Sequence, residues 1–209
     1  MRMNNTEQPR TKEIERQEPN NPRFDFVWIV PADQEIERTT RDLLLKGVHF
    51  LREFYGKDFE FSPDYEVRMT SSQKHGAAGA EISVSVPVVQ EYRKQKDPYL
   101  RAQHESGFVH ELVHNIFPDE AMPMLAELAY MLERGYAKRL SDLAVLLRDG
   151  RLDQPYLDGL KGVADELGVS VEILLNPEVR HDLEQIRNVF RRAVEQEMHA
   201  LREERAGSS

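Results

Sequence analysis

Hydrophobic and polar residues follow two different patterns along this chain. In the first part they alternate or gather in short runs rich in aromatic and β-branched residues, which favours strands at 24–30, 65–70 and 82–86. Apolar residues at helical spacing predict a helix at 36–55. Because Pro87 follows the last strand directly, we expect that strand to lie at an edge of the sheet.

Downstream of residue 89 the apolar residues recur at helical spacing only. Prolines and glycines that follow the apolar runs indicate where the helices end. The predicted helices span 103–117, 123–134, 137–148, 157–167, 171–175 and 183–201. Strands followed by helices predict an α+β fold, with a small N-terminal mixed sheet and a mostly helical C-terminal part.

The same patterns divide the chain into three parts. Residues 1–23 contain almost no large apolar side chains, so they are predicted to form a disordered tail. Residues 24–150 hold the sheet and the first helices and are predicted to form the main domain. Residues 151–209 are predicted to form a helical C-terminal subdomain.

Composition narrows the chemistry of any functional site. The chain has no cysteine, so a bound metal must be held by nitrogen and oxygen atoms. Its formal net charge of -9 argues against general nucleic-acid binding. No apolar run is long enough to cross a bilayer, and the N-terminus lacks a secretory signal, so we expect a soluble, cytoplasmic protein without a membrane partner.

The motif His110-Glu111-Leu112-Val113-His114 lies within the predicted helix 103–117 and matches HExxH. Residues four apart stand on one helix face, so both imidazoles can reach one zinc ion. Glu111 is then placed to accept a proton from a metal-bound water as the water attacks a carbonyl. The motif predicts one catalytic zinc per chain, Glu111 as general base, and a peptide or protein substrate.

A catalytic zinc usually has three protein ligands, and no third histidine follows. Glu120 stands where the HExxHxxGxxH pattern has that histidine. Asp119 and Glu120 are expected to follow the helix too closely to fold back, and to suit the start of the next helix. Glu127 and Glu133 both lie on that next helix. Glu127 has small and apolar neighbours, so it is the predicted third ligand, whereas Glu133 is the alternative at an exposed end.

The segment HELVHNIFPDEAMPMLAELAYM, residues 110–131, resembles the gluzincin metallopeptidases, in particular small peptidase MA-like proteins. The resemblance implies a zincin-like catalytic domain at 24–150, with Glu127 as third ligand. The spacing of the aminopeptidase N branch would select Glu133 instead. Residues 77–86 are similar to the glycine-containing edge strand that, in this superfamily, lies above the active-site helix and binds extended substrate.

Several interpretations stay open at this stage. The group that stabilises the oxyanion could be His75, Tyr156 or His181, since these enzymes usually use a tyrosine or histidine there. Residues 164–170 resemble the turn of a helix-turn-helix module, but the segment that follows supplies no basic residue for DNA, which favours a plain helical corner. The alternative functions are therefore a regulatory protein with a metallopeptidase-like domain and a DNA-binding module, or a non-catalytic zinc-binding relative.

Overall fold

The computed structural model describes residues 25–30, 33–56, 64–78 and 81–207. Within them one mixed sheet has the order β1-β2-β4-β3. The strands β1 and β2 are parallel, as are β2 and β4, whereas β3 runs antiparallel to β4. This agrees with the predicted α+β class and mixed sheet. The strands are β1 (Asp25–Val30), β2 (Asp64–Thr70), β3 (Gly76–Ala78) and β4 (Glu81–Ser85).

The prediction of an edge position for residues 82–86 is wrong, because β4 lies between β2 and β3. Pro87 belongs to the first turn of α2 (Val86–Lys94), where a missing backbone N–H costs nothing. The Ser85 side chain caps this helix by accepting from the N–H of Val88. The proline therefore marks the start of a helix, and the edge is formed by β3, whose small residues have little strand propensity.

The helix that carries HELVH is shifted toward the N-terminus relative to its prediction. It begins at Pro98 because the Asp97 carboxylate caps it, and it ends at Val113 instead of residue 117. The other predicted helices are present with altered ends. The helices are α1 (Gln34–Tyr55), α3 (Pro98–Val113), α4 (Ala121–Glu133), α5 (Lys138–Arg148), α6 (Gln154–Leu167), α7 (Val171–Leu174) and α8 (Leu183–Gly207).

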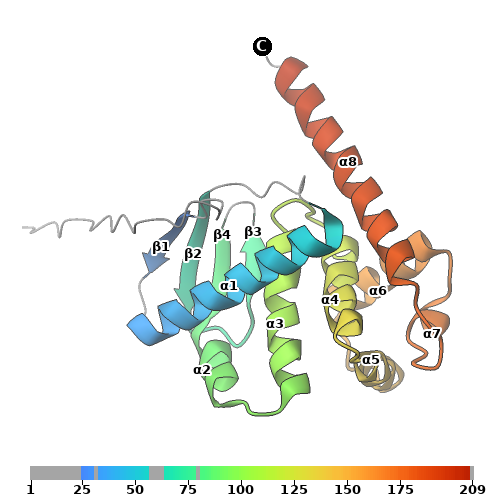
Figure 1. Ribbon diagram of the computed structural model, residues 1–209, viewed down its shortest axis with the longest axis horizontal. Helices are drawn as coiled ribbons and strands as arrows, with labels where there is room; N and C mark the ends of the chain where they lie inside the picture. Colours follow the sequence, from blue (N-terminus) through green and yellow to red (C-terminus); the bar gives the residue numbers. More distant parts are fainter. Residues whose placement is uncertain (1–24, 31–32, 57–63, 79–80, 208–209) are drawn as a thin grey trace, which may run out of the picture.

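Helix α3 is packed between its neighbours and so has a fixed orientation (Figure 1). It contacts α1 on one side and α4 on another. The crossing with α1 is close at Gly47, where a Cβ atom would lie 2.6 Å from Leu112 Cδ1. Val109, Leu112 and Val113 are fully buried in these contacts. The C-terminal end of α3, which carries His110 and His114, faces the start of α4.

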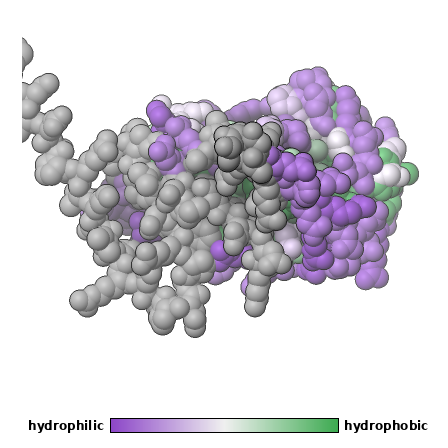
Figure 2. All heavy atoms as spheres, turned by 90° about the horizontal axis from the view of Figure 1, so that it is seen from above, coloured by the Kyte–Doolittle hydropathy of each residue, from purple (hydrophilic) through white to green (hydrophobic). Residues whose placement is uncertain are grey.

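The C-terminal helices join the same hydrophobic core as the rest of the fold. Helix α6 packs against α4 through buried residues such as Leu160 and Val163, and α8 adds Phe190. The far end of α8 extends away from the body of the molecule (Figure 1). The coloured surface in Figure 2 is mostly hydrophilic. Among the described residues, no helix has the length and hydropathy needed to span a membrane.

Candidate metal centre

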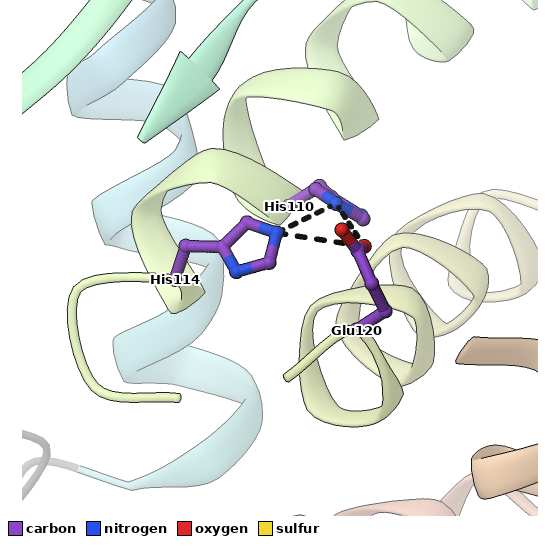
Figure 3. Close-up of side chains that lie close together, drawn as sticks. All are labelled: His110, His114 and Glu120. Carbon is purple, nitrogen blue, oxygen red and sulfur yellow. Dashed lines mark hydrogen bonds and ion pairs between the residues drawn. The ribbon is translucent and has the colours of Figure 1, made fainter. Parts of the chain in front are cut away.

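The two histidines of HELVH lie at the C-terminal end of α3 and point toward each other (Figure 3). His110 is in the last turn and only 5% exposed, while His114 is the C-cap residue. Their Nε2 atoms are 3.1 Å apart. The helical spacing thus brings both rings to one point, as the sequence predicted.

The third group at this point is Glu120, which directly precedes α4 (Figure 3). Its Oε2 atom lies 3.2 Å from His110 Nε2 and 3.5 Å from His114 Nε2. Glu120 occupies the N-cap position of α4 but makes no side-chain cap hydrogen bond there, so its carboxylate is free to turn toward the rings. The expectation that Glu120 follows the helix too closely is wrong. Because α3 already ends at Val113, the intervening residues have room to reverse the chain.

The His114 imidazole is held at its Nδ1 edge, and both imidazoles direct Nε2 at the cluster. His114 Nδ1 lies 3.1 Å from the carbonyl oxygen of Phe117. A carbonyl can only accept, so Nδ1 carries the hydrogen and Nε2 keeps its lone pair in the neutral ring. His110 Nδ1 lies 3.5 Å from Glu127 Oε2, an ion-pair contact in which Nδ1 makes no hydrogen bond. The Nε2 atoms of both rings face the cluster.

Two observations test whether a metal ion suits this group. Three donors at about 2.1 Å from one tetrahedral zinc ion stand about 3.4 Å apart. The separations between His110 Nε2, His114 Nε2 and Glu120 Oε2 are 3.1, 3.2 and 3.5 Å. In addition, Glu120 Oε2 is buried without a hydrogen-bond partner, which is costly unless a cation satisfies it. The donor set fits zinc in both respects.

Glu127, the third ligand predicted from sequence, lies on the other side of the His110 ring. Its carboxylate, 1% exposed, accepts from Arg139 Nε and Nη2 at 3.2 and 2.7 Å through Oε1. Its Oε2 accepts from the Tyr156 hydroxyl at 2.9 Å. Both oxygens are thus engaged, and neither belongs to the donor group. The group of donors that the structure brings together therefore contains Glu120 and not Glu127.

Glu133, the alternative third ligand, is also remote from the cluster. It pairs with Arg187 of α8, at 3.7 Å. Residues six positions apart on α4 face different directions, so a helix that directs Glu127 at His110 cannot also direct Glu133 there.

The electrostatics of the cluster follow from burial and from its carboxylates. Burial lowers the pKa of His110, but Glu120 and Glu127 outweigh it and raise that pKa to about 10. Burial raises the pKa of Glu127, but Arg139 and His110 outweigh it and lower that pKa to about 2. Glu127 is therefore an anion held beside the His110 ring.

Glu111 lies beside the donors without belonging to them. Its side chain is largely withdrawn from solvent, and this burial raises the pKa of its carboxyl to about 7, with further contributions from nearby Glu120 and Glu127 and an opposing one from His110. A carboxylate next to a metal site, in an environment of this kind, is suited to accept and return a proton.

The structure separates the three residues considered for oxyanion stabilisation. Tyr156 is at the site, with its ring stacked on His110 at 5.8 Å between centroids, but its hydroxyl is bound to Glu127. His75 accepts from the N–H of Ser85 through Nδ1, and its Nε2 is buried without a hydrogen-bond partner. His181 lies between α7 and α8, and its Nε2 is also buried without a partner. Of the three, only Tyr156 contacts the histidines among the interactions of the described residues.

Sequence reasoning missed Arg139 and considered Glu120 but set it aside. Arg139 is 7% exposed, on α5, and no local pattern connects it to α4. For Glu120 a signal was present, because it occupies the third-histidine position of HExxHxxGxxH. Tyr130, which lies one turn after Glu127, donates its hydroxyl to Glu105 and does not contact the histidines.

The helical corner at residues 164–170 is formed by α6, Gly168 and α7. Gly168 has φ 68°, the left-handed conformation that ends a helix. Helix α7 is only four residues long, with Glu172 as its charged residue. A recognition helix needs several turns to reach base edges and phosphates, so this geometry favours the plain corner over a DNA-binding module.

Comparisons with known protein families, with curated proteins and with solved structures find no match to this chain. Its function therefore has to be argued from the site itself.

Proposed function

We propose that this chain is a zinc-dependent metallopeptidase whose metal is held by His110, His114 and Glu120. The observation that carries the proposal is the convergence of two Nε2 atoms and one buried, unpartnered carboxylate oxygen at separations of 3.1 to 3.5 Å. Two imidazoles and a carboxylate leave one position of a tetrahedral site open, which is the arrangement of catalytic rather than structural zinc.

Zinc at this position would polarise a carbonyl oxygen and lower the pKa of a bound water to about 7. Glu111 lies between the two histidines at the end of α3, and it would accept the proton of the attacking water and pass it to the leaving amine. The Phe117 carbonyl would hold the His114 imidazole by a hydrogen bond, and the Glu127 carboxylate would attract the Nδ1 edge of His110 by charge.

A peptide substrate is favoured by the position of β3. This strand contacts α3 and pairs only with β4 in the described part of the sheet. Its other edge offers backbone groups to an extended chain, which can add to the sheet by main-chain hydrogen bonds. An edge strand that contacts the HExxH helix supports the proposal of an extended peptide as substrate.

The test replaces Glu111 with Gln, which keeps size and shape but removes the base. Zinc-loaded wild type should cleave peptides in an unfolded-protein or peptide-library assay, lose this activity with a chelator, and regain it with zinc. Glu111→Gln should retain the fold and one zinc but lose activity by roughly a hundredfold or more.

Two results would contradict the catalytic role. If wild type binds zinc but cleaves nothing, the chain is a non-catalytic zinc-binding protein. If wild type and Glu111→Gln cleave equally, another group or a contaminating enzyme supplies the base.

A further inference from the structure

We propose that Glu127, Arg139 and Tyr156 form a positioning unit for His110, so that the C-terminal helix α6 is part of the metal centre. This inference rests on the proposed zinc site and deepens it. The three side chains come from α4, α5 and α6, and none of them is within the donor group. They act on the zinc only through His110.

The unit fixes His110 by two different contacts. Glu127 Oε2 lies 3.5 Å from Nδ1, on the edge of the ring opposite the donor cluster. The Tyr156 ring stacks on the His110 ring with an interplanar angle of 8°. The carboxylate attracts the Nδ1 edge of the ring by charge, without a hydrogen bond, and the aromatic ring on the ring face limits rotation of the imidazole.

The Glu127 carboxylate itself accepts three hydrogen bonds. Arg139 binds Oε1 through two nitrogens, and the Tyr156 hydroxyl binds Oε2. These partners fix the position of the carboxylate, because moving it would leave the buried guanidinium of Arg139 and the Tyr156 hydroxyl without their acceptor.

Tyr156 connects this unit to the C-terminal part of the chain. It lies in the first turn of α6, outside the 24–150 segment that carries HELVH and Glu120. Its hydroxyl donates to Glu127, and its ring stacks on the ring of His110. Residues beyond 150 therefore contribute directly to the centre.

The decisive variant is Tyr156→Phe, which removes the hydroxyl and keeps the ring and the Glu127–Arg139 ion pair. Its matched control is Tyr130→Phe, which also removes one hydroxyl bonded to a carboxylate, that of Glu105 at 2.7 Å, away from the histidines. Zinc affinity would be measured by competition with a chromophoric chelator, and the visible spectrum of the cobalt-loaded protein would report ligand geometry.

Tyr156→Phe should weaken zinc binding by up to roughly tenfold and change the cobalt spectrum, and Glu127→Gln should weaken it by roughly 10- to 100-fold. Tyr130→Phe should leave zinc affinity and the cobalt spectrum unchanged, although it should lower thermal stability about as much as Tyr156→Phe does. Glu127→Gln leaves Arg139 buried without its carboxylate and can unfold the chain, so Tyr156→Phe decides the matter. Equal affinity and identical cobalt spectra for Tyr156→Phe and wild type would overturn the inference. Absence of zinc or cobalt binding by wild type would instead overturn the proposed function.

Discussion

Replacing Glu120 with Ala tests the metal centre most directly, because the structure and the sequence disagree about this residue. The side chain makes no cap hydrogen bond to α4 and is partly exposed, so its loss should leave the fold intact. What it removes is the oxygen that lies 3.2 and 3.5 Å from the two Nε2 atoms. The change should therefore act on zinc affinity far more than on stability.

The magnitude follows from the energy of zinc binding. Four-ligand structural sites bind zinc with about 10–16 kcal/mol, or roughly 3–4 kcal/mol per ligand. Loss of one ligand should weaken binding by roughly 100- to 1,000-fold, since each 1.4 kcal/mol is a factor of about ten. This exceeds the roughly 10- to 100-fold loss expected for Glu127→Gln, which acts through His110.

The assay is competition with a chromophoric chelator, run on wild type, Glu120→Ala and Glu133→Ala. Glu133→Ala serves as the control because its carboxylate pairs with Arg187 instead of facing the cluster. Unchanged affinity in Glu120→Ala would refute the assignment of this residue as a ligand. A larger loss in Glu127→Gln or Glu133→Ala would return the third ligand to α4.

Three further predictions concern the energetics of the centre and of the sheet. Zinc at 100 times its Kd should stabilise the chain by about 2.7 kcal/mol, raising Tm by roughly 5–10 °C in thermal unfolding, and a chelator should reverse this; an unchanged Tm would argue against binding to the folded state. A Cβ at Gly159 would lie 2.9 Å from the Glu120 carbonyl oxygen, and one at Gly162 would lie 2.6 Å from Ala121 Cβ. Both Gly→Ala variants should lose about 1–3 kcal/mol of unfolding free energy by overpacking. Only Gly159→Ala should also lower zinc affinity in the chelator assay. Equal affinities would show that α6 does not determine the position of Glu120. Burial and nearby His104 lower the pKa of His75 from 6.5 to about 4. The neutral ring therefore contributes stability above pH 6.5 that is lost as the pH falls to 4, by up to roughly 3 kcal/mol, and urea titrations with chelator should show a smaller acid loss in His75→Gln than in wild type.

The sequence alone determined the parts of the site that depend on local geometry. His110 and His114 share a face because residues four apart on a helix always do, whatever the rest of the fold. Glu111 is fixed beside them by the same regularity. The strands before the helices likewise follow from side-chain periods that are local to each segment.

Tertiary structure decided the residues whose positions depend on where elements end and what packs on them. Glu120 reaches the histidines because α3 stops at Val113 and Gly159 lets α6 approach the start of α4. Glu127 has the buried, small-residue surroundings expected of a ligand, but Arg139 and Tyr156, distant in sequence, engage its oxygens and make it a partner of His110. Such contacts between distant residues leave no periodic signal in the chain, so only the packed fold distinguishes the carboxylate that faces both Nε2 atoms from the one that lies behind the His110 ring.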